Sequence, residues 1–165
     1  MKTNKLIWLL LITVIMNTVK THAQKVWTGN LLTKNLKDFA SGNYTKVQGT
    51  IIIEDYGGVD LTVLKKLQQC SGNITISKNK KLESLRGLEN LLVVGGKIVI
   101  KKNPELYRFC SLKKQLLEKG IKGEEISKGI IEKVDIERNG YNPSFINLQN
   151  KDCYSYKISD FCLSC

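Results

Sequence analysis

The chain has 165 residues and a formal net charge of +11, and its length suits one domain with a sizeable core. Charge or glycine interrupts every apolar run after residue 16, so we expect no transmembrane segment in the mature protein. The basic balance favours polyanionic partners, although a lysine-rich composition equally serves to keep a surface soluble.

The first 23 residues have the layout of a secretory signal peptide. Lys2 and Lys5 precede an apolar run over residues 6–16, and Ala23 ends a segment suited to cleavage. The run is too short for a membrane anchor, which takes roughly 20 residues. Cleavage would leave Gln24 as the N-terminus and remove three lysines, giving a net charge of 11 − 3 = +8. We therefore expect a protein that is secreted or held at the cell envelope or surface, where nucleic acid is not an expected partner.

Triplets rich in β-branched residues recur through the middle of the chain. They start at residues 51, 74 and 98, at spacings of 23 and 24 residues, and a fourth starts at residue 134. The first and third positions of each triplet are apolar, so they should face inward while the middle residue faces outward. The inward residues are Ile51, Ile53, Ile74, Ile76, Ile98, Ile100, Val134 and Ile136. This pattern predicts a mainly β fold, a short parallel β-solenoid of about four coils.

Leucines between the triplets repeat with the same period. They are Leu61, Leu64 and Leu67 and, 24 residues later, Leu85, Leu88 and Leu91. A leucine at every third position indicates a tight helical or 3₁₀ turn of the kind found in leucine-rich repeats. One short helix is expected from Leu112 to Glu118, within an irregular stretch from Ser111 to Lys133 that would form an insertion or partial cap.

An asparagine follows three of the triplets, three residues beyond the last strand isoleucine, at Asn79, Asn103 and Asn139. Asparagine tolerates left-handed backbone and can hydrogen-bond neighbouring peptide groups at a sharp bend. We expect these side chains to stack in a structural column at a corner of the fold.

The chain contains five cysteines, and all of them lie in the part expected to be exported, where disulfides are stable. Cys110 follows the third coil and Cys153 the fourth, so we predict a disulfide that clips the insertion to the solenoid. Cys70 would then remain as a buried thiol. Cys162 and Cys165 form a Cys-x-x-Cys near the C-terminus, which we interpret as a local disulfide or a frayed tail, because a zinc site needs a second ligand pair. We therefore expect no metal and no cofactor.

The sequence resembles the receptor L-domain family, in its short secreted bacterial (Bacteroidetes-type) version. The resemblance spans roughly residues 36–153 and rests on Gly-x-Ile-x-Ile coils, the Leu-Arg-Gly-Leu-Glu-Asn-Leu segment at 85–91, the Asn-Pro-Glu-Leu segment at 103–106 and the Asn-Gly-Tyr-Asn-Pro-Ser segment at 139–144. It implies a right-handed β-solenoid with leucine-rich-repeat character, used for recognition outside the cell. The expected organisation is a signal peptide at 1–23, the solenoid at 24–153 and a tail with the Cys-x-x-Cys at 154–165.

A candidate ligand-binding column lies two residues past the last isoleucine of each triplet. Asp55 occupies this position in the first coil, whereas Lys78, Lys102 and Arg138 occupy it in the next three. Stacked strands would place these cations along one edge, where they could bind a flexible polyanion. Nearby Lys80, Lys81 and Lys101 would widen the basic stripe. The alternative is that the lysines protect a solenoid corner against aggregation.

Nothing in the sequence indicates an active site. The acids Glu54, Asp55, Asp60 and Glu83 fall in different coils without a repeated spacing, and the expected mature chain has no histidine. We therefore expect a non-enzymatic recognition module without catalytic residues, whose partner is an extracellular protein or an acidic glycan. A structural subunit of a surface assembly is the alternative, and a polysaccharide lyase or hydrolase is less expected.

Overall fold

The computed structural model describes residues 24–112, 117, 134–149 and 152–155. The expected signal peptide, the C-terminal Cys-x-x-Cys, most of the helix expected after Leu112 and most of the insertion lie outside the described residues.

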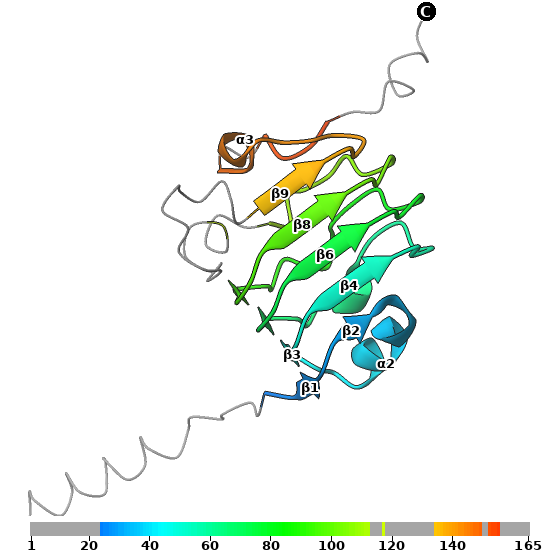
Figure 1. The fold of residues 1–165 in the computed structure, drawn as a ribbon, viewed down its shortest axis with the longest axis vertical. Helices are drawn as coiled ribbons and strands as arrows, with labels where there is room; N and C mark the ends of the chain where they lie inside the picture. The colour runs from blue at the N-terminus through cyan, green and yellow to red at the C-terminus, as the bar shows by residue number, and fades with distance from the viewer. Residues whose placement is uncertain (1–23, 113–116, 118–133, 150–151, 156–165) are drawn as a thin grey trace, which may run out of the picture.

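The described chain is mainly β and forms two parallel sheets. The first has the strand order β1 (Val26–Thr28), β3 (Lys46–Gln48), β5 (Gln69–Cys70) and β7 (Val93–Val94). The second has the order β2 (Leu31–Leu32), β4 (Ile51–Glu54), β6 (Ile74–Ser77), β8 (Ile98–Lys101) and β9 (Val134–Glu137). From β1 to β8 the chain alternates between the sheets, and strands of the second sheet lie side by side in Figure 1.

The triplets pair in the register that their spacing predicts. Ile51 pairs with Ile74, Ile74 with Ile98, and Ile98 with Val134 across the 36-residue gap. The inward isoleucines of β4, β6 and β8 are at most 1% exposed, whereas Val134 and Ile136 of the terminal strand are half-buried. This inward and outward alternation is therefore confirmed.

The first sheet was not expected from the sequence. Each of β3, β5 and β7 has a single inward residue, and Val47, Cys70 and Val94 stack in register and are buried. Cys70 thus lies in the core as a free thiol, as predicted, and its sulfur is 3.3 Å from the carbonyl oxygen of Gly49. Burial raises the pKa of this thiol to about 11.

The leucine segments form tight turns that close the core. Leu64 donates its backbone N–H to Leu61 and Leu67 donates to Leu64, each over 2.8 Å, and this spacing of three residues is that of a 3₁₀ turn. The turn η2 (Thr62–Leu64) is a 3₁₀ helix, so the expected turn type is confirmed. Gly87 has φ +112°, and a Cβ there would collide with the carbonyl oxygen of Leu61, so only glycine fits this position.

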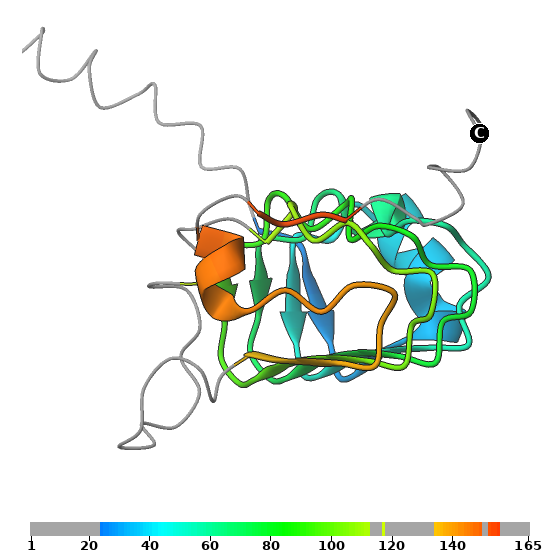
Figure 2. The same cartoon turned by 90° about the horizontal axis from the view of Figure 1, so that it is seen from above.

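Two short α-helices occur in the described part of the chain, and neither was predicted. The turn η1 (Thr33–Asn35) leads into α2 (Leu36–Ser41), which buries Leu36 and Phe39 at the N-terminal end of the sheets. The helix α3 (Phe145–Gln149) lies at the opposite end, beside β9 in Figure 1 and across one side of the molecule in Figure 2. Within the described residues, no helix has the length and hydrophobicity that crossing a bilayer takes.

The predicted asparagine column is present and forms a hydrogen-bond ladder. The Nδ2 atom of Asn103 donates to the carbonyl oxygen of Ile76 over 3.0 Å and to Oδ1 of Asn139 over 2.8 Å. Its Oδ1 accepts from the backbone N–H of Asn79 over 3.0 Å and from Nδ2 of Asn79 over 2.9 Å. Asn142 accepts from Asn139 at the C-terminal end of the ladder. Asn79 and Asn103 are fully buried, and these bonds satisfy their amides.

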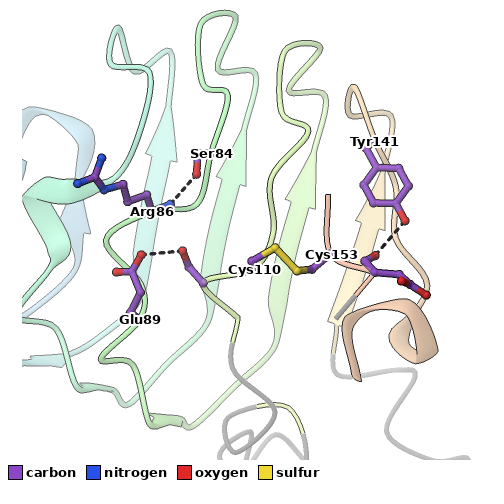
Figure 3. Close-up of a disulfide and its surroundings, with 8 residues drawn as sticks. Ser84, Arg86, Glu89, Cys110, Tyr141 and Cys153 are labelled. Atoms are coloured by element: carbon purple, nitrogen blue, oxygen red, sulfur yellow. Dashed lines mark hydrogen bonds between the residues drawn. A yellow bond between two sulfur atoms is a disulfide. The ribbon is translucent and has the colours of Figure 1, made fainter. Parts of the chain in front are cut away.

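The predicted disulfide joins Cys110 to Cys153 (Figure 3). The backbone N–H of Phe109 donates to the carbonyl oxygen of Cys153 over 2.7 Å, and that of Ser155 donates to Tyr107 over 3.1 Å. The described residues 152–155 therefore lie against the turn that contains Cys110. The predicted pairing of Cys110 with Cys153 is therefore confirmed, and the disulfide fixes residues 152–155 to the rest of the fold. Most of the insertion that it was expected to clip lies outside the described residues.

Candidate ligand-binding edge

The residue after each of four neighbouring strands has left-handed backbone. The φ angles are +52° at Asp55, +58° at Lys78, +59° at Lys102 and +57° at Arg138. Residues other than glycine adopt this conformation uncommonly, and it persists where surrounding contacts fix it. The asparagine ladder supplies those contacts, because the residue after each of the four positions donates its backbone N–H to an asparagine side chain of the ladder.

This arrangement corrects one detail of the sequence interpretation. The left-handed residue is the one before each asparagine, and the asparagines themselves serve as buried hydrogen-bonding groups. Lysine and arginine have no special preference for positive φ, so only the geometry of the neighbouring ladder identifies these positions.

The structure brings Lys78, Lys102 and Arg138 together along one edge, as their spacing predicted. The backbone hydrogen bonds of the second sheet continue past its strands. The N–H of Lys78 donates to the carbonyl oxygen of Lys101, and the N–H of Lys102 donates to that of Glu137, each over 3.2 Å. Strand β9 therefore keeps the register of the earlier strands. Successive residues of the edge are separated by about 4.8 Å, the distance between paired strands. All three side chains are exposed, so we call these residues the basic edge.

Acidic groups lower the charge at the start of the basic edge. Asp55 holds the first position, and Nζ of Lys78 lies 3.8 Å from Oε1 of Glu54. The Lys78 and Glu54 side chains are 57% and 40% exposed, so water screens this ion pair and it adds little stability. Glu54 also accepts a hydrogen bond from Oγ of Ser77 over 2.6 Å.

Lys101 does not widen the basic edge, contrary to expectation. It lies on the outward face of β8, where Nζ is 2.6 Å from Oδ2 of Asp135 and 3.3 Å from Oε1 of Glu137 on β9. The hydrogen bond to Asp135, together with Glu137, raises the pKa of the Lys101 ammonium group. Its charge is therefore opposed by two carboxylates of the neighbouring strand, a cluster that the sequence interpretation missed.

The positive charge of the basic edge is concentrated at Lys102 and Arg138, away from Asp55 and Glu54. Among the described residues, no carboxylate lies within ion-pair distance of Lys102 or Arg138. Lys80 and Lys81 are also exposed and lie in the turn after β6. The edge thus presents separate cations with exposed, hydrated side chains, an arrangement that suits a repeating anion better than one buried anionic group.

No group of three or more histidine, cysteine, aspartate or glutamate side chains is placed to hold a metal ion in the part of the chain described. Comparison with known proteins finds no matching family model, no matching curated protein and no matching solved structure.

Proposed function

We propose that the chain is a secreted or cell-surface recognition module, without enzymatic activity, that binds acidic polysaccharide along the basic edge. In this proposal the two parallel sheets are two faces of a short right-handed β-solenoid of the receptor L-domain type. The alternation of the chain between the sheets and the 3₁₀ leucine turns support this reading of the fold.

An extracellular location is supported by two independent features. The Cys110–Cys153 disulfide suits an oxidising compartment, because intracellular thiols are normally kept reduced. Residues 1–23 have the composition of a secretion signal, and N-terminal sequencing of exported protein should find Gln24 first. Export of a chain that still begins at Met1 would contradict the signal proposal.

The observation that carries the ligand proposal is the register of three exposed cations on successive strands. A single exposed ion pair contributes roughly 0.2–1 kcal/mol, so one contact would give negligible affinity. A polymer that carries one anion per repeat can contact several cations together, and the contacts then reinforce one another. Binding of this kind weakens as salt rises, because the Debye length falls to about 3 Å at 1 M salt.

The test replaces Lys78, Lys102 and Arg138 together with asparagine. Asparagine removes the charge and tolerates positive φ, so the left-handed backbone at each site is preserved. The matched control replaces Lys37, Lys46 and Lys97 with asparagine, which removes the same charge outside the edge. Circular dichroism and urea unfolding verify that both variants fold.

Binding is measured by retention on immobilised polygalacturonate and by titration with the soluble polymer. We expect the edge variant to lose most binding and the control variant to retain it. Equal losses in both variants would mean that only net charge matters, and the basic edge would not be the site. Degradation of the polymer would instead indicate an enzyme.

A structural subunit is the second candidate, and the sheet order provides its support. β1 and β2 are the terminal strands of their sheets within the described chain. A terminal strand presents unpaired backbone groups on which another chain could stack. Long oligomers in native mass spectra over a concentration series would favour this function over glycan binding.

A further inference from the structure

A pocket at the N-terminal end of the fold involves none of the residues of the basic edge. It has a volume of about 410 Å³ and lies between α2 and the η2 turn. Figure 1 shows α2 beside β2 at this end of the molecule. Small-molecule sites typically occupy roughly 300–1,000 Å³, so the pocket has room for a sugar unit.

The walls of the pocket differ in chemistry. Ala40 and Val63 are half-buried and contribute apolar surface, with Phe39 buried at the lining, whereas Lys65 and Lys66 are exposed and contribute positive charge. None of the described residues that line the pocket carries a carboxylate, so the lysine charges are not neutralised within it. A lining that combines apolar and cationic residues suits a ligand that has both a carbon framework and an anionic group.

One of the two cations is held in place. Nζ of Lys66 donates a hydrogen bond to Oδ1 of Asn43 over 2.6 Å. Asn43 has φ +57°, a backbone conformation that asparagine tolerates, and it follows the helix α2 directly after Gly42. Fixing the lysine before the ligand arrives reduces the entropy lost on binding.

Tyr44 also lines the pocket and has aromatic neighbours. The ring of Tyr44 stacks on Phe39 with centroids 5.7 Å apart and meets Trp27 edge-on at 5.3 Å. Nζ of Lys25 lies 4.8 Å from the centroid of the Tyr44 ring, which adds a third cation near the pocket. Trp27 therefore contacts a pocket residue and can report on occupancy.

We propose that this pocket binds a single anionic sugar unit, with its carboxylate or sulfate facing Lys65 and Lys66 and its ring against the apolar wall. The site is separate from the basic edge and does not require the edge to bind a polymer. It would recognise one anionic unit, whereas the edge would recognise a repeat of charges.

The experiment follows Trp27 fluorescence during titration with glucuronate, glucose 6-sulfate and uncharged glucose. The protein that begins at Gln24 is used, because Trp27 is its only tryptophan and the fluorescence then reports on this site alone. Saturable binding of glucuronate alone would assign the site to carboxylates, and binding of both anions would assign it to anionic sugars in general. Equal binding of glucose, or no saturable response to either anion, would overturn the proposal.

Three variants distinguish the pocket from diffuse charge. Replacing Lys65 and Lys66 with glutamine should weaken binding at least about tenfold, because charge-assisted hydrogen bonds are lost. Ala40→Leu keeps every charge and narrows the pocket with a larger side chain, so it should also reduce binding at least about tenfold. The control replaces Lys80 and Lys97 with glutamine and should bind normally.

Retained binding in the folded Ala40→Leu variant would exclude the pocket as the site. Equal loss of binding in the variant at Lys65 and Lys66 and in the control at Lys80 and Lys97 would also exclude the pocket. Substitutions along the basic edge should leave glucuronate affinity unchanged, so failure of the polysaccharide proposal and failure of the pocket proposal are distinguishable.

Discussion

Replacing Asn103 with alanine tests the asparagine ladder at its centre. The substitution removes the acceptor of two donors on Asn79, its backbone N–H and one proton of its amide. Asn79 is fully buried, so water does not replace the lost acceptor. An unsatisfied buried donor costs about 1–3 kcal/mol, so two donors should cost about 4 kcal/mol.

That loss is a large part of the total stability of a domain, which is roughly 5–15 kcal/mol. Urea unfolding followed by circular dichroism measures it as a lower midpoint with an unchanged slope. The control is Asn142→Ala at the exposed end of the ladder, where water can replace the acceptor and the cost should stay below about 1 kcal/mol. Equal losses for the two variants, or a loss below about 1 kcal/mol at Asn103, would refute this account of the ladder.

Three further predictions concern the cysteines and the glycines. Replacing Cys110 and Cys153 with serine opens a cross-link of 43 residues, so the free energy of unfolding should fall by about 2–4 kcal/mol in urea titrations. The Cys70 pKa is raised from 9.0 to about 11, so the unfolded thiol loses its proton first and stability should fall by about 2 kcal/mol from pH 9 to pH 11. Cys70→Val should reduce that fall, and alkylation of the native thiol at pH 8 would contradict its burial. Gly87→Ala should cost more than about 2 kcal/mol because of its positive φ and close carbonyl neighbour, whereas Gly57→Ala enters open space and should change stability by less than about 0.5 kcal/mol.

The strands of the second sheet were predictable because their inward residues obey two periods at once. Alternation within each triplet assigns the buried face, and the spacing of 23 and 24 residues assigns the register. The first sheet has the same longer period, since Val47, Cys70 and Val94 are also 23 and 24 residues apart. Its strands β5 and β7 have two residues each, so they show no alternation that would identify them as strands.

The N-terminal end departs from the repeat and was therefore missed. There the helix α2 takes the place of a leucine turn, and its buried residues Leu36 and Phe39 are three positions apart. This spacing also fits a 3₁₀ turn, so the sequence does not separate the two structures.

The position of the basic edge followed from the sequence, but its electrostatics did not. Counting residues from each isoleucine finds Lys78, Lys102 and Arg138 without knowledge of their neighbours. The partners of Lys101 became clear only with the pairing of β8 and β9, which sets Glu137 directly opposite and Asp135 on the same face. Side-chain pairs across parallel strands depend on this register, which the irregular spacing before β9 obscured.

The central claim is that the folded chain recognises acidic polysaccharide through the basic edge. The most direct measurement is the affinity of the purified protein for polygalacturonate at about 50 mM and about 500 mM salt, beside neutral dextran, for the unmodified chain and for the variant with asparagine at residues 78, 102 and 138. We predict saturable binding of polygalacturonate alone, weaker at high salt and largely lost in the variant. Binding of dextran with similar affinity, or binding of polygalacturonate that neither salt nor the variant weakens, would contradict the claim.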